Sequence, residues 1–110
     1  MDVPLPTAMS VETLKTWRDS ATPHALLDVR EARELAVCAV SGALHVPMQE
    51  VPARLQDLPR DLPLVVMCHH GMRSRMVMQF LRNQGFANAI NLEGGIDAWA
   101  ALIEPGMARY

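Results

Sequence analysis

The chain has 110 residues, of which 50% are hydrophobic and 20% are charged, and its formal net charge is -2. This length and balance indicate one globular domain over residues 1–110, and the small net charge argues against nucleic acid as a partner. The start of the chain has no basic stretch followed by an apolar one, and no apolar run reaches membrane-spanning length. We therefore expect a cytoplasmic protein, with no membrane partner, in which Cys38 and Cys68 are free thiols.

The first half of the chain alternates between helical and extended patterns. Ser10 can cap a helix in which Val11, Leu14 and Trp17 recur at helical spacing. The elements expected after it are a buried strand at 24–30, a short helix at 31–37, a short strand at 42–47 and a helical segment at 48–58.

The second half repeats this alternation. Its expected elements are a strand at 64–67, an amphipathic helix at 74–84, a strand at 87–92, a closing helix at 94–102 and a short tail at 103–110. Strands that alternate with helices predict an α/β fold with a mostly parallel sheet and helices on both faces. Ligands of such sheets bind beyond the C-terminal ends of the strands. Cys68, at the end of an apolar strand, is therefore a candidate site residue.

The segment CHHGMR, residues 68–73, lies between that strand and the helix that follows. Backbone N–H groups of such a loop can point inward and, together with the helix N-terminus, form a cradle for an anion. Gly71 permits the backbone angles that this curl needs. A cysteine in the cradle has a lowered pKa and is a nucleophile at neutral pH. Cys38 lacks this setting, and we interpret it as packing.

The side chains around the loop predict no metal site. His69 and His70 are adjacent, so they cannot easily both turn onto one ion, and no Cys-x-x-Cys spacing supports them. We expect them to line the rim and add positive potential when protonated, although either could act as a general base. Met72 is expected to face the opening, and Met67 and Met76 to pack in the core.

The spacing between Cys68 and Arg73 separates two chemistries. Four residues lie between them, whereas cysteine phosphatases use a similar cradle with five residues between cysteine and arginine, so that a phosphate fits. One residue fewer makes a narrower ring of N–H groups, which suits a single extra sulfur atom on Cys68. The spacing favours sulfur transfer over the phosphatase or arsenate reductase alternative.

Three segments, in this order, resemble the single-domain rhodanese (thiosulfate sulfurtransferase) family. They are LLDVRE (26–31) followed by Glu34, CHHGMRS (68–74) and LEGGIDAW (92–99), within a core of about 10–102. The chain departs from the family at Cys38-Ala39-Val40, where Gly-His-Ile is usual. Because the lost residues were structural, we expect the fold to survive.

The resemblance implies a five-stranded parallel sheet and a ping-pong reaction without a cofactor. The Cys68 thiolate would take the outer sulfur of thiosulfate or a related donor as a persulfide, and cyanide, a thiol or a protein acceptor would then remove it. The persulfide would be held by the loop amides, and Arg73 and Ser74 would contact the anionic donor; the implied loop residues are His69, His70, Gly71, Met72, Arg73 and Ser74.

The resemblance also places Asp28 and Arg30 near the loop. We expect them either to order the loop by charged hydrogen bonds or to form an ion pair that stabilises the fold. Gly94 and Gly95 are interpreted as turn residues, and Trp99 as a core residue. An active sulfurtransferase is the main hypothesis, and a sulfur-carrier or interaction module with weak small-molecule turnover is the alternative.

Overall fold

A computed structural model describes residues 5–110 and contains one five-stranded sheet in the order β1-β5-β4-β2-β3. Every pair of neighbouring strands is parallel. The strands are β1 (Ala8–Met9), β2 (Ala25–Asp28), β3 (Leu44–His45), β4 (Leu64–Met67) and β5 (Ala89–Leu92). The predicted α/β class and the five parallel strands are thus confirmed.

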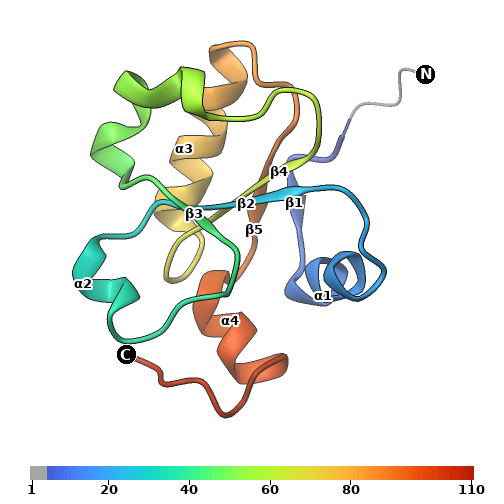
Figure 1. Cartoon of the computed structure of the whole chain (residues 1–110), viewed down its shortest axis with the longest axis vertical. Coiled ribbons are helices and arrows are strands. Elements are labelled where there is room, and N and C mark those ends of the chain that lie inside the picture. The colour runs from blue at the N-terminus through green and yellow to red at the C-terminus, as the bar shows by residue number, and fades with distance from the viewer. Residues whose placement is uncertain (1–4) are drawn as a thin grey trace.

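Helices cover both faces of the sheet (Figure 1). One face packs against α3 (Met72–Asn83) and the 3-10 helix η1 (Met48–Asp57), and the other against α1 (Val11–Asp19) and α4 (Gly95–Leu102). The short helix α2 (Ala32–Leu35) follows β2. Within residues 5–110, no helix has the length and apolar character needed to cross a membrane.

The central strand β4 contributes to both halves of the core. Leu64 and Val66 pack on the side of α3, whereas Val65 and Met67 pack on the side of α1 and α4, because successive side chains of a strand point to opposite faces. All four are buried, as a continuous apolar run in a parallel sheet indicates. Because β4 ends at Met67, Cys68 lies at the C-terminal edge of the sheet.

The structure differs from the sequence-based expectations at several elements, among them β3 and α2, which are shorter than the segments expected at 42–47 and 31–37. The strand β1 was not predicted, because its two residues are too few to show a periodic pattern. The helix α3 begins at Met72 rather than at Ser74. The segment after β3 is 3-10 helical and has a kink at Arg54, whose backbone angles of φ -124° and ψ 25° are not helical.

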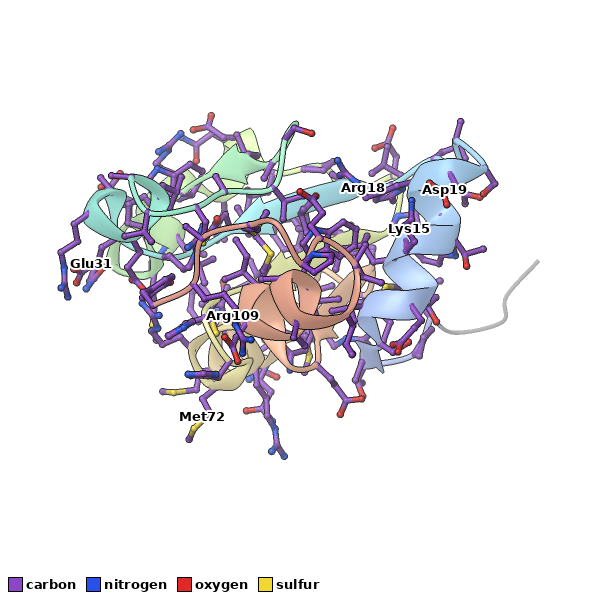
Figure 2. The ribbon with its side chains drawn as sticks, turned by 90° about the horizontal axis from the view of Figure 1, so that it is seen from below. Lys15, Arg18, Asp19, Glu31, Met72 and Arg109 are labelled. Atoms are coloured by element: carbon purple, nitrogen blue, oxygen red, sulfur yellow. The ribbon has the colours of Figure 1, made fainter. Side chains whose placement is uncertain are left out.

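Two predictions for core side chains are confirmed and one is wrong. Met67 and Trp99 are buried, as expected. Met76, expected in the core, is 60% exposed, and Met72, one turn earlier in α3, is 79% exposed. Residues four positions apart share a helix face, so both side chains lie on the solvent face of α3; Figure 2 shows Met72 pointing away from the ribbon.

Candidate active site

Cys68 lies immediately after β4 and is surrounded by hydrogen-bond donors. Its Sγ accepts the Gly71 N–H at 3.1 Å and the Ser74 hydroxyl at 3.3 Å. The residue is 1% exposed. Burial raises the pKa of the thiol, but the Ser74 hydroxyl and the N–H groups of Ser74, Gly71 and His70 lower it, and the net shift is downward. The loop therefore favours the thiolate, as the sequence predicts.

The first turn of α4 keeps the loop carbonyls away from the sulfur. The Cys68 carbonyl accepts the Ile96 N–H at 2.9 Å, and the His69 carbonyl accepts the Asp97 N–H at 3.0 Å. A Cβ at Gly95 would lie 2.5 Å from both carbonyl oxygens, so only glycine permits this approach. With the carbonyls bound to α4, the N–H groups of the loop are left for the sulfur.

The side chain of Asn91, in β5, hydrogen bonds to two residues of the segment 68–74. Its Oδ1 accepts the Ser74 hydroxyl at 2.6 Å, and its Nδ2 donates to the Gly71 carbonyl at 3.2 Å. Sequence reasoning missed this residue, although a polar residue inside a buried apolar strand is a usable signal, since buried polar groups need partners. Asn91 fixes both Gly71 and Ser74, the residues whose donors reach Cys68.

Arg73 is held by Glu34 of α2. Its two terminal nitrogens donate to the two Glu34 carboxylate oxygens at 2.7 and 2.8 Å, which is a bidentate pair. Arg73 holds the pKa of Glu34 well below its usual range. In turn, Glu34 and, to a smaller extent, the Cys68 thiolate raise the pKa of Arg73. The Arg73 guanidinium is thus held by Glu34, and its charge and that of the Cys68 thiolate favour each other.

Asp28 and Arg30 form a fully buried ion pair, with Arg30 Nη2 2.8 Å from Asp28 Oδ2. Arg30 also donates to the Cys38 carbonyl at 2.9 Å and to the Tyr110 hydroxyl at 3.0 Å. Neither side chain hydrogen bonds to residues 68–74 in the described structure. The structure contains the ion pair of the second expectation. Arg30 turns toward α2 and Tyr110, and an ordering effect of the pair on the loop stays a prediction.

The two histidines occupy different environments. His70 is exposed and lies 3.8 Å from the Asp97 carboxylate. His69 stacks on the Tyr110 ring, with centroids 3.8 Å apart and planes at 10°. Burial, followed by the neighbouring His70, lowers the pKa of His69. His70 thus faces solvent at the rim beside Asp97, whereas the lowered pKa of His69 favours its neutral form.

A groove of about 470 Å³ lies beside the loop on the side of α3. His70, Gly71 and Met72 of the loop line it at one end, and Arg75 and Met76 line it along α3. Met72 stands at this opening, as predicted. Cys38 lies elsewhere, partly buried against the core beside α4, and both cysteines are free thiols.

The Rhodanese-like domain family matches the chain over residues 10–102. The chain belongs to this family. A sulfurtransferase of Allochromatium vinosum is 39% identical over 75 residues, which are 68% of this chain and 70% of that protein. The solved structure of the human single-domain sulfurtransferase TSTD1 superposes with a TM-score of 0.80 at 27% identity, and the match covers 89% of this chain and 98% of that one.

Other relatives carry the matching part in longer chains. The adenylyltransferase and sulfurtransferase MOCS3-2 of Zea mays is 34% identical over 103 residues, which are 87% of this chain and 21% of that protein. This chain thus spans about a fifth to a quarter of the length of these larger curated relatives. Several of these matching proteins are named sulfurtransferases.

Proposed function

We propose that the chain is a sulfurtransferase that carries sulfur as a persulfide on Cys68. The observation that supports this most directly is the set of N–H and O–H donors around the Cys68 sulfur, with Gly71 N–H at 3.1 Å and Ser74 Oγ at 3.3 Å. These donors lower the pKa of the thiol and so favour the nucleophilic form. The same donors can hold the terminal sulfur of a persulfide, which is also an anion.

The reaction has two steps when thiosulfate is the donor. The Cys68 thiolate attacks the outer sulfur of thiosulfate, a new S–S bond forms, and sulfite leaves with the electron pair of the broken S–S bond. An acceptor nucleophile, cyanide or a thiol, then attacks the terminal sulfur of the persulfide. Cys68 leaves as a thiolate, so the enzyme returns to its starting state without an external oxidant or reductant.

Intact-protein mass spectrometry tests this proposal. Incubation with thiosulfate is expected to add one sulfur, about 32 Da, and Cys68→Ser should abolish the gain. Cys38→Ser is the matched control and should retain it, because Cys38 lies outside the loop. No mass gain with thiosulfate or with any persulfide donor would contradict the proposal, and hydrolysis of an aryl phosphate that depends on Cys68 would favour the phosphatase instead.

One relative favours the alternative, a sulfur-carrier or interaction module: a Bacillus subtilis protein that is 33% identical over 96 residues is named a putative sulfur carrier. The burial of Cys68 at 1% exposure agrees with a sulfur that is released only to a docked partner. A cyanide turnover assay separates the two, because both form the persulfide and gain the same mass from thiosulfate. A transferase forms the persulfide and turns over cyanide at a steady rate, whereas a carrier forms the persulfide and turns over cyanide slowly.

A further inference from the structure

Tyr110 lies outside the segment that matches the family, residues 10–102, yet it joins both ion pairs of the site. Its hydroxyl donates to Glu34 Oε2 at 2.7 Å and accepts from Arg30 Nη1 at 3.0 Å. Glu34 in turn binds Arg73. A continuous chain of contacts therefore runs from the buried Asp28–Arg30 pair to the guanidinium beside the catalytic loop.

We propose that Tyr110 is a positioning residue of the sulfur-transfer site: its hydroxyl fixes the Glu34 carboxylate that holds Arg73, and its ring holds His69 flat against the loop. This inference rests on the proposed function, because it assigns Tyr110 a role in placing the cation that meets an anionic sulfur donor.

The first argument is the stiffness of the anchor. Arg30 has no exposed surface and is held by the Asp28 carboxylate and the Cys38 carbonyl. Arg73, in contrast, is 36% exposed at its side chain, and its side-chain hydrogen bonds in the described structure are the two to Glu34. The Tyr110 hydroxyl connects this partly exposed pair to the fully buried one.

The second argument is the saturation of the Glu34 carboxylate. Its Oε1 accepts from Arg73 and from the Glu31 N–H at 3.1 Å, and its Oε2 accepts from Arg73 and from Tyr110. Each oxygen therefore has two donors, which leaves the carboxylate one orientation. Burial raises the pKa of Tyr110 to about 12, so the hydroxyl keeps the proton that it donates.

The third argument is the path of the segment after α4. It folds back along that helix, where Arg109 pairs with Asp97 at 3.1 Å, and Figure 2 shows Arg109 beside α4. The chain end then lies beside α2 (Figure 1), and the Tyr110 ring covers His69, whose Nε2 is buried without a partner. The segment thus closes one side of the loop and leaves open the groove beside Met72.

Steady-state kinetics with thiosulfate and cyanide test the inference. Tyr110→Phe keeps the ring and removes the hydroxyl, so Arg73 is less well placed. The KM for thiosulfate should rise about three- to tenfold. This is the effect expected when one hydrogen bond to a charged group is lost and water partly replaces it. The kcat should stay within about twofold of the wild-type value. Val37→Ala is the control: Val37 lines the same cavity as Tyr110 and Arg73 and is 43% exposed, and its loss should leave KM unchanged.

Three outcomes would overturn the inference. An unchanged KM in Tyr110→Phe would remove the role of the hydroxyl, and a fall in kcat that follows a fall in melting temperature would make the residue merely structural. If the wild-type chain takes no sulfur from thiosulfate, the proposed function fails. Proton NMR then tests the stacking of Tyr110 on His69 independently of activity. The ring of Tyr110 should shift the imidazole signals of His69 upfield. This shift should be lost in Tyr110→Leu and kept in Tyr110→Phe. If the two variants give the same His69 signals, the ring of Tyr110 does not hold His69 against the loop and the inference fails.

Discussion

At the scale of single residues, the Ser74 hydroxyl has one proton and two acceptors. The Asn91 Oδ1 lies at 2.6 Å and the Cys68 Sγ at 3.3 Å, and a hydroxyl can donate to only one of them at a time. When Cys68 ionises, its sulfur becomes the stronger acceptor. The hydroxyl can then turn toward the thiolate, which makes Ser74 a donor that responds to the charge on the sulfur.

Ser74→Ala should raise the pKa of Cys68, because it removes the side-chain donor that lowers it. The pH profile of Cys68 alkylation by iodoacetamide is expected to move to higher pH. Sulfur loading from thiosulfate at pH 7 should slow by about three- to tenfold. Ser41→Ala, an exposed serine that bonds to Arg18 far from the loop, is the control. An alkylation profile that does not move would show that the backbone donors alone set the pKa.

The sequence predicted those site residues that are contiguous in the chain. Cys68, Arg73 and Ser74 lie in one segment, so their spacing could be counted before any fold was available. The contacts of Ser74 with Asn91 and of Glu34 with Tyr110 join residues that are 17 and 76 positions apart. Such contacts are set by how the sheet and the final segment pack, and no local pattern encodes them.

At the scale of elements, the junction of α4 with the loop gives the site its shape. The amides of Ile96 and Asp97 bind the carbonyls of Cys68 and His69, and Gly95 makes the close approach possible. Gly95 also has a φ of 59°, in the left-handed region that disfavours side chains. The double glycine predicted as a turn is therefore also the contact surface between two elements, which sequence alone could not show.

Gly95→Ala should disrupt both the stability of the fold and the loading of Cys68. A Cβ placed 2.5 Å from two backbone carbonyl oxygens cannot be relieved by a side-chain rotation, so the loop or α4 must shift. We expect a loss of about 1–3 kcal/mol in the free energy of unfolding, measured by urea denaturation, and at least a tenfold slower gain of mass from thiosulfate.

Gly106→Ala is the matched control for this change, since a Cβ there meets no atom within 4 Å. It should leave both the free energy of unfolding and the rate of sulfur loading within experimental error of the wild type. If Gly95→Ala behaves like Gly106→Ala, the loop does not depend on its contact with α4.

At the scale of the whole molecule, two ion pairs connect segments that are far apart in sequence. The Asp28–Arg30 pair is fully buried at the end of β2, and Glu34 of α2 binds Arg73 at the start of α3. Tyr110 joins the two pairs to the final segment. Residues from both halves of the chain thus meet at the C-terminal edge of the sheet, the position predicted for ligand binding.

The Glu34–Arg73 pair should make the free energy of unfolding depend on pH in the acidic range. Arg73 holds the pKa of Glu34 below its unfolded value of about 4.3, so the stabilisation is complete above that pH and is lost as the pH falls toward the folded pKa. Glu34→Gln should therefore be about 1 kcal/mol less stable than wild type at pH 7, a value reduced by solvent screening of the partly exposed Arg73. The difference should shrink at pH 3.

Urea unfolding at the two pH values measures this difference. Glu50→Gln is the control, because Glu50 forms an exposed pair with Arg54 on η1 and its loss should leave the acid dependence of the wild type in place. A constant gap between wild type and Glu34→Gln from pH 7 to pH 3 would contradict the electrostatic origin of the effect.

The lengths of the two outer strands have a consequence for solubility during and after folding. In the described sheet, β1 and β3 form the edges and contain two residues each, whereas the central β4 carries the apolar run Leu64–Met67. An edge of two residues offers few unpaired backbone groups to the strands of another molecule. The apolar run of β4 is therefore paired on both sides, by β2 and β5, and each two-residue edge offers little backbone for edge-to-edge association.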